Sequence, residues 1–381
     1  FAEEMDDLRA RDWQAEMDSA LQTWRDLIGR ASRVAVPDPG VRQAFLACLA
    51  DLFIMREPVS GGRVAATPGT EGYRAAEPFE PAIVAVALDQ MGYSLEAIEG
   101  YIACLEAQEL DGNWTEPKGW AHWMWGAAGF KAWAGMEHYR LTGDYTFLET
   151  LYPRLAASTR FQERERAETR SAAGEEPALT SGLMPPGMGD AGLLNDEDFY
   201  GVFFPHNIWA VYADRQTLEA ARILGKTAEF AELSPLVERG EADLLRALDR
   251  GAIQEEDYRC IPGVPGKTCG SRWGVSNALT PCRLLGPQHD LIEGTLRKIE
   301  ARISPGGIPI HTGWMKEGMW VAIALDNLAE AHLARGEGDA AAAYLYATLN
   351  HGTPLVSWCE ERGQEPGSKE TAGDMQHLWT P

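Results

Sequence analysis

The chain has 381 residues, of which 45% are hydrophobic and 24% are charged, so it is large enough for one big helical or barrel domain or two average ones. Its formal net charge of −23 argues against nucleic acid or an anionic membrane surface as a partner, because both require a basic footprint. No apolar run is long enough to span a bilayer. The six cysteines form neither a dense disulfide framework nor a zinc-binding spacing, and we expect no metal and no cofactor.

The chain opens with a long amphipathic pattern over residues 2–30. Trp13, Met17, Leu21 and Trp24 recur at steps of three or four residues, which predicts one helix with a single apolar stripe. Two prolines and a glycine in the segment 34–40 end this pattern. We therefore expect residues 1–35 to be a linker helix from a missing N-terminal domain, and residues 36–381 to form a catalytic domain.

The rest of the chain alternates helical patterns with loops and has almost no strand signal. Helices are predicted at 40–56, 77–91, 94–108, 122–141, 145–170, 206–224, 228–248, 275–285, 288–303, 318–334 and 340–349. Short turns containing glycine join most of them into hairpins, while long loops fall at 57–76, 109–121, 171–205, 251–274, 304–317 and 350–381. This alternation predicts an all-α fold, an (α/α)6 barrel or toroid of helical hairpins, with one functional face and a truncated last helix. A helical solenoid is the alternative, but the repeat period is irregular.

The loop beginning at Asp111 is unusually rich in tryptophan. The chain has thirteen Trp, which is a high number, and aromatic rings commonly line carbohydrate clefts. We expect this loop to form a sugar subsite in which the tryptophans are platforms and the polar side chains bind hydroxyl groups. Its candidate residues are Asp111, Trp114, Glu116, Trp120, Trp123 and Trp125. The alternative is a Trp-rich hairpin end that packs in the core.

Three further loops carry acids beside aromatic or glycine residues. Asp190 stands between glycines, where the backbone can approach a ligand closely, although a structural turn is an equal alternative. His311 and Trp314 precede a predicted helix and are candidates for substrate binding. The last loop combines Trp358, Glu360, Glu370 and His377 with glycines. Carboxylates from loops that face each other across a barrel can flank a glycosidic bond, one as acid and one as base.

The segment Tyr139–Pro153, which reads YRLTGDYTFLETLYP, resembles a hairpin of the six-hairpin glycosidases, the (α/α)6-barrel glycoside hydrolases. Asp111-Gly-Asn-Trp114 is similar to their sugar-binding loop. The loop before Asp190 resembles the acid loop of the processing α-glucosidases. The ending from Trp358 to His377 is similar to that of α-L-rhamnosidases, with Cys359 inserted between the tryptophan and the glutamate.

The resemblance implies an inverting glycoside hydrolase that cleaves an α-linked glycoside. It places the general acid on the loop of Asp190 and the general base on the loop of Glu360, with Glu361 or Glu370 as alternative bases. A polysaccharide lyase on an (α/α) toroid and a non-catalytic carbohydrate-binding barrel are the other interpretations. The expected partner is a carbohydrate substrate, and the sugar, the linkage, the compartment and the oligomeric state stay open.

Overall fold

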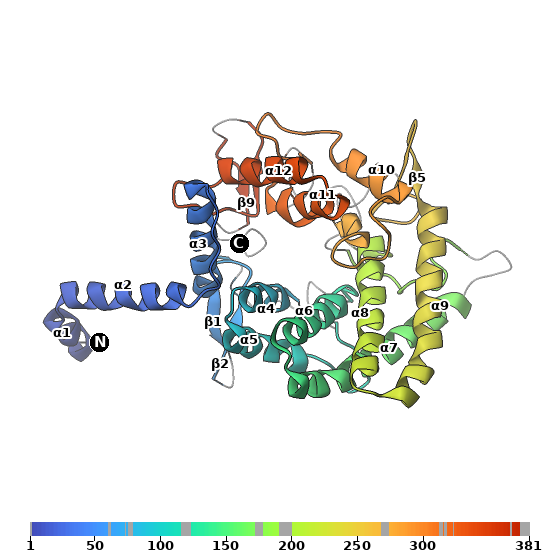
Figure 1. The fold of residues 1–381 in the computed structure, drawn as a ribbon, viewed down its shortest axis with the longest axis horizontal. Coiled ribbons are helices and arrows are strands. Elements are labelled where there is room, and N and C mark those ends of the chain that lie inside the picture. The colour runs from blue at the N-terminus through green and yellow to red at the C-terminus, as the bar shows by residue number, and fades with distance from the viewer. Residues whose placement is uncertain are drawn as a thin grey trace.

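The computed structural model describes residues 2–59, 62–72, 74, 79–115, 123–171, 178–189, 200–267, 274–311, 315, 318–322, 324–365 and 368–373. Over this part of the chain 59% of the structure is helical, and the helices are arranged as a ring with a protruding N-terminal arm (Figure 1). The predicted all-α toroid is thereby confirmed. No helix among the described residues has the length and apolarity needed to cross a membrane.

The arm consists of two helices, so the prediction of one helix over residues 2–30 was wrong. α1 (Ala2–Ala10) and α2 (Trp13–Gly29) meet at Asp12, which caps α2 by accepting hydrogen bonds from the N–H groups of Gln14 and Ala15. This N-cap starts α2 as a separate helix, so α1 does not continue into α2. The predicted stripe lies on α2 and faces solvent, since Trp13 is 66% and Met17 59% exposed.

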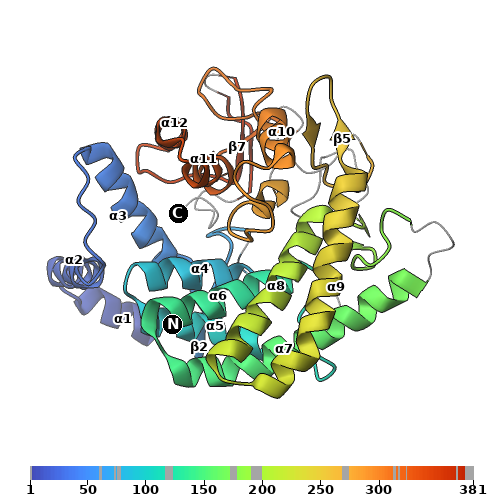
Figure 2. The same ribbon diagram turned by 45° about the vertical axis from the view of Figure 1, so that its right-hand side comes forward.

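Helices that surround the centre of the ring alternate along the chain with helices on its outside (Figures 1 and 2). The inner elements are α4 (Glu80–Gln90), α6 (Ala127–Thr142), α8 (Phe204–Ile223), a 3₁₀ turn (Gly274–Ala278), and a π-helical segment (Ala324–Ala329) that leads into α11 (Glu330–Arg335). The outer ones are α5 (Ser94–Glu106), α7 (Tyr145–Ser171), α9 (Thr227–Gly251), α10 (Asp290–Ile299) and α12 (Gly338–Asn350). α3 (Pro39–Ile54) lies beside α12, and the Tyr346 hydroxyl donates to Asp38, the N-cap of α3, at 3.0 Å.

The prediction of a helix at 275–285 is wrong beyond the first turn. Only the 3₁₀ turn forms, because Pro281 has no N–H to donate and disfavours helical geometry at the residue before it. The Asn277 side-chain amide donates to the carbonyl of Thr280 at 3.1 Å, which satisfies part of the backbone at this bend.

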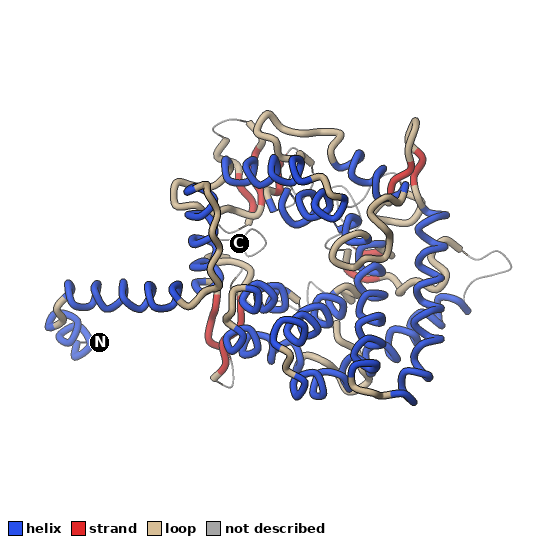
Figure 3. The backbone as a smooth tube through the Cα atoms, in the orientation of Figure 1, coloured by secondary structure: helices blue, strands red, loops and turns tan. Residues whose placement is uncertain are grey.

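Short strands occur in the connections between helices, although almost no strand pattern is present in the sequence (Figure 3). Three antiparallel pairs join β1 (Arg56–Val59) to β2 (Arg63–Ala66), β3 (Gly187–Met188) to β4 (Tyr200–Gly201), and β5 (Ile253–Gln254) to β6 (Arg259–Cys260). A three-stranded sheet has the order β7 (Gly318–Trp320), β8 (Glu361–Gly363) and β9 (Thr371–Ala372). Strands this short carry no readable alternation of polar and apolar residues.

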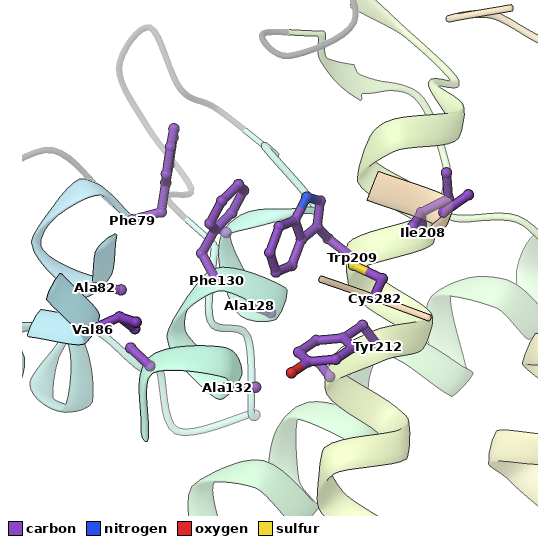
Figure 4. Close-up of a cluster of buried hydrophobic side chains, with 14 of the residues drawn as sticks. Phe79, Ala82, Val86, Ala128, Phe130, Ala132, Ile208, Trp209, Tyr212 and Cys282 are labelled. Carbon is purple, nitrogen blue, oxygen red and sulfur yellow. The ribbon is translucent and has the colours of Figure 1, made fainter. Parts of the chain in front are cut away.

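Close contact between inner helices depends on small residues. A Cβ at Gly129 of α6 would lie 2.6 Å from the Cβ of Trp209 on α8, so only glycine allows this approach. Ala128 and Ala132 continue the small face of α6, and Figure 4 shows them beside the larger side chains of α8. At Gly129 the bulky ring comes from α8 and the space for it from α6.

A buried ion pair joins the inner and outer layers. Arg166 of α7 and Asp214 of α8 are each 1% exposed, and the Arg166 Nη1 lies 2.5 Å from the Asp214 Oδ2. Gln162 donates to the other Asp214 oxygen at 3.2 Å. Gly240 of α9 leaves room for the guanidinium, since a Cβ there would lie 2.8 Å from Nη1. Three helices thus meet at one pair of opposite charges.

We predict that Arg166→Met destabilises the protein by about 3–5 kcal/mol, because it leaves the Asp214 charge buried without its partner. Urea unfolding monitored by circular dichroism measures this loss, and adding Asp214→Leu should recover part of it. Arg160→Met is the matched control on the same helix, because Arg160 pairs with Glu232 at the surface and should cost at most about 1 kcal/mol. Equal effects of the two arginine substitutions would contradict the prediction.

A second buried carboxyl group, Asp51 of α3, makes stability depend on pH. Burial raises the pKa of Asp51 from 3.8 to about 6. Between these two values the folded state holds the proton more tightly than the unfolded state does. Ionisation of this group therefore reduces stability as the pH rises through that window.

We predict that Asp51→Asn removes this contribution. The urea midpoints of the two proteins, measured from pH 4 to pH 7, should show the wild type losing stability relative to the variant until about pH 6 and then running parallel. Other acids titrate equally in both proteins and cancel in the difference. A constant difference over the whole range would show that Asp51 does not carry the shift.

Candidate active site

The N-terminal ends of the inner helices lie together at one end of the ring. The N–H of Gly126, just before α6, donates to His206 Nδ1 in the first turn of α8 at 3.1 Å. The rings of Phe79, just before α4, and Phe130, in the first turn of α6, stack at 5.0 Å. The loops at 57–76, 109–121, 171–205, 251–274 and 304–317 each precede one of these inner elements. In the last loop β8 pairs with β7, just before the π-helical segment, so the described parts of the loops lie at this end, as the hairpin pattern predicts.

A row of aromatic rings lies across this end of the ring. The Phe130 ring lies between the rings of Phe79 and Trp209 of α8 (Figure 4). The centroids of Phe130 and Trp209 are 3.9 Å apart, and their planes are 23° from parallel. The Trp209 indole N–H donates to the side-chain oxygen of Asn277 at 3.2 Å, which extends the contact to the next inner element. All three rings are at most 5% exposed.

A cavity of about 560 Å³ lies on the other side of this row. Phe130 and Trp209 line it, together with Trp133, Glu137 and Glu330 from later turns of the inner helices. It therefore occupies the centre of the ring, toward the end with the short turns. Burial raises the pKa of Glu330, which accepts a hydrogen bond from the Thr280 hydroxyl at 3.3 Å. Among the described residues that line this cavity, none is a predicted site residue.

Glu360 lies at the loop end, directly before β8. It is 6% exposed, and Gly373 packs against it so closely that a Cβ at Gly373 would lie 2.5 Å from the carboxylate oxygen Oε2. Gly373 has φ +71°, a backbone conformation that glycine adopts without a steric cost. Gly373, directly after β9, thus covers one side of the Glu360 carboxylate.

The segment before Glu360 is fixed by Trp358. Its ring is 4% exposed and its indole N–H donates to the carbonyl of Thr348 in α12 at 2.9 Å. The thiol of Cys359 donates to the carbonyl of Glu361 at 3.1 Å. Burial raises the pKa of this thiol, and the charges of Glu360 and Glu361 raise it further, so Cys359 stays protonated at neutral pH. The inserted cysteine is therefore a packing residue beside the carboxylate.

Glu370 differs from Glu360 in its environment. It is exposed, and it lies in the turn between β8 and β9, where the N–H of Gly363 donates to its carbonyl at 2.9 Å. Its own N–H donates to the Ser368 hydroxyl at 3.2 Å. Of the three glutamates that the sequence offers as the base, Glu360 and Glu361 are buried and Glu370 is exposed.

The Asp111 loop is packed onto the ring. Asp111 Oδ1 accepts from the N–H of Asn113 at 2.9 Å, and the backbone of Gly112 lies against Ala157 of α7. Trp114 is 1% exposed, its indole N–H donates to the carbonyl of Cys104 at 2.7 Å, and its own carbonyl accepts from Lys131 at 2.9 Å. In this conformation Trp114 has no exposed face on which a sugar ring can stack.

Trp123 and Trp125 support the loop of Asp190. Their rings stack at 5.1 Å and 22°, and the Trp125 indole N–H donates to the carbonyl of Pro185 at 2.8 Å. Gly187 of β3 lies directly against the carbonyl of Trp123, where no other side chain has room. Trp123 is half-buried and has φ 56°, an uncommon value for a residue with a side chain. Asp190 itself lies outside the described residues.

His311 marks the start of another turn at this end. It is half-buried with φ 61°, and its N–H donates to the carbonyl of Gly318 at 2.8 Å. The remaining predicted site residues, which are Glu116, Trp120, Trp314 and His377, fall outside the part of the chain that the structure describes.

Two buried polar side chains at the loop end were not assigned to the site from the sequence. Glu80 begins α4 at 6% exposure, and His206 lies in the first turn of α8 at 3%. Glu361, which the sequence offers as an alternative base, begins β8 at 0% exposure. An acid in the first turn of a helix is ordinarily favoured by the helix dipole, so the position of Glu80 gives no signal in the sequence. Among the described residues no group of three or more His, Cys, Asp or Glu side chains is arranged to hold a metal ion.

No protein-family model and no curated protein sequence matches the chain. Solved structures do match it. A bacterial glucoamylase complexed with acarbose has a TM-score of 0.68 at 11% identity, covering 97% of this chain and 58% of that one. A metal-independent α-mannosidase from Streptococcus pneumoniae, in a complex with α-1,6-mannobiose, has a TM-score of 0.64 at 12% identity over 96% and 95% of the two chains. A rhamnosidase from Klebsiella oxytoca with rhamnose bound has a TM-score of 0.58 at 14% identity over 92% and 64%.

The matches agree with the hairpin motif of Tyr139–Pro153 and with the ring of inner and outer helices. At these identities they establish the fold, while the exact family stays open. The chain thus has the (α/α)6-barrel fold of the six-hairpin glycosidases.

Proposed function

We propose that the protein is a glycoside hydrolase that cleaves an α-linked glycoside with inversion at the anomeric carbon. The observation that carries this proposal is the Glu360 carboxylate, buried at the loop end of the ring and covered by Gly373. A buried carboxylate at the mouth of such a ring is suited to removing a proton from water, because packing fixes its position. The matched glucoamylase, α-mannosidase and rhamnosidase structures support the same reaction class.

In this mechanism Asp190 protonates the leaving oxygen and Glu360 deprotonates the attacking water. Inversion requires the two carboxyl groups to lie about 6.5–9.5 Å apart, so that a water molecule fits between one of them and the sugar. Support for Asp190 comes from the base of its loop, where Gly187 rests on Trp123 at the same end of the ring as Glu360. Glu370 is the weaker candidate for the base because it is exposed in a turn.

The substrate is proposed to contact the half-buried residues Trp123 and His311 at the loop end. One side of the Trp123 ring stacks on Trp125, and the ring is only partly buried. A ring supported in this way is suited to stacking on a pyranose. Trp114, Trp125 and Trp358 act as the scaffold in this proposal, because each is at most 5% exposed and has its indole N–H bonded to a backbone carbonyl. The matched structures hold different sugars, so the sugar is left to experiment.

We also propose that residues 1–35 link the ring to a further domain. The support is the apolar stripe of α2, which projects from the ring and leaves Trp13, Met17 and Leu21 at 46–66% exposure (Figure 1). Such a stripe on a water-soluble protein is ordinarily covered by another surface.

We predict that Glu360→Gln lowers kcat by about 10²–10⁴-fold, the range typical for loss of a general base. A screen of aryl α-glycosides first identifies a substrate, and NMR of the first product then gives its anomeric form, which should be inverted. The loss should also appear with an α-glycosyl fluoride, whereas Asp190→Asn should retain activity on the fluoride because that leaving group needs little protonation. Glu370→Gln is the comparison variant. An unchanged rate for Glu360→Gln, or a retained anomer, would overturn the assignment of the base.

We further predict that Gly373→Ala lowers kcat at least about tenfold, because the added Cβ meets the Glu360 side chain and displaces its carboxylate. Gly143→Ala is the matched control. Gly143 has almost the same φ, +72°, and no atom lies within 4 Å of an added Cβ. The two variants share the backbone strain, and only the first touches Glu360. Equal loss of activity in both would mean that the effect arises from backbone strain alone.

A further inference from the structure

We propose that Glu361 is a positioning residue that fixes Met315, and through Gly318 also His311, at the mouth of the site, so that the two consecutive glutamates have separate tasks. This inference rests on the proposed function, in which Glu360 is the base. It concerns how the neighbouring side chain fixes residues beside His311, which is proposed to contact the substrate.

Glu361 is fully buried, with 0% exposure, in the middle strand of the sheet β7–β8–β9. Its Oε2 accepts a hydrogen bond from the backbone N–H of Met315 at 2.7 Å. A hydrogen bond to a charged acceptor is stronger than one between neutral groups, and a buried carboxylate is costly without such donors. The bond joins the C-terminal segment to a turn 46 residues earlier in the chain.

Backbone hydrogen bonds join His311, Gly318 and Met315. The N–H of His311 donates to the carbonyl of Gly318 at 2.8 Å, and the N–H of Gly318 donates to the carbonyl of Met315 at 3.1 Å. Gly318 also packs on Met315, because an added Cβ would lie 2.5 Å from the Met315 Cβ. Met315 is therefore joined through Gly318 to His311, and the carboxylate of Glu361 accepts the Met315 N–H.

Strand pairing fixes Glu361 itself. Glu361 pairs with Trp320 of β7 on one side and with Ala372 of β9 on the other. Gly373, the next residue after Ala372, packs against Glu360. The two adjacent glutamates thus contact different parts of the chain, Glu360 the end of β9 and Glu361 the turn at Met315. A change at Glu361 should move His311 and its neighbours while leaving the base in place.

The experiment compares Glu361→Gln, which keeps an oxygen acceptor, with Glu361→Leu, which fills a similar volume without one. Hydrogen exchange of the full chain, followed on peptides that contain Met315, reports the hydrogen bond without needing activity. Protection of the Met315 amide should be kept in Glu361→Gln and fall at least tenfold in Glu361→Leu. Glu365→Leu is the matched control. Glu365 is exposed and lies just after β8, the strand that contains Glu361, and its substitution should leave the protection of Met315 unchanged.

Kinetics on the substrate found in the aryl glycoside screen provide the second readout. Glu361→Leu should raise KM about tenfold or more with kcat within about fivefold, and Glu361→Gln should restore KM. The acid limb of the pH profile of kcat/KM should stay in both variants. A kcat loss for Glu361→Gln as large as that for Glu360→Gln, together with loss of the acid limb, would make Glu361 the base. Unchanged Met315 protection in Glu361→Leu would overturn the positioning role whether or not the protein hydrolyses a glycoside.

Discussion

The close approach of α6 and α8 is the constraint on which the loop end of the ring depends. Gly129 lets the backbones meet at Trp209, and this contact brings Phe130 onto the Trp209 ring and Gly126 onto His206. The N-terminal ends of the inner helices are thereby held side by side. A larger residue at Gly129 would separate the two helices and with them the loops that the helices carry.

The ring itself was predictable from the sequence, because helices with apolar faces and glycine-containing turns leave a periodic pattern. The pattern failed where a helix depends on context. Pro281 stops the inner helix that Val275 begins, and Asp12 divides the first helix by capping the second half. The strands β7, β8 and β9 were not predicted, since a strand of two or three residues forms by pairing with a distant partner and has no local signal.

The candidate site, like the fold, could be predicted from the sequence only in part. Glu360 could be selected from its neighbours Trp358 and Gly363, but its burial depends on Gly373, which reaches it only through the pairing of β8 with β9. Trp114 illustrates the opposite case. A tryptophan beside Asp-Gly-Asn resembles a sugar platform in sequence, yet the structure uses its indole and its carbonyl to bind Cys104 and Lys131. Residue type alone does not distinguish these two uses of an aromatic ring.

The arm has a consequence for the fluorescence of the protein. Trp13 and Trp24 are 66% and 37% exposed, whereas Trp114, Trp209 and Trp358 are at most 4% exposed. A neutral quencher such as acrylamide therefore reaches the arm before it reaches those ring tryptophans. A surface that covers α2 would reduce the quenching of Trp13 and Trp24, whereas Trp114, Trp209 and Trp358 resist the quencher as long as the ring is folded. Quenching of the arm tryptophans is thus a probe of what covers α2.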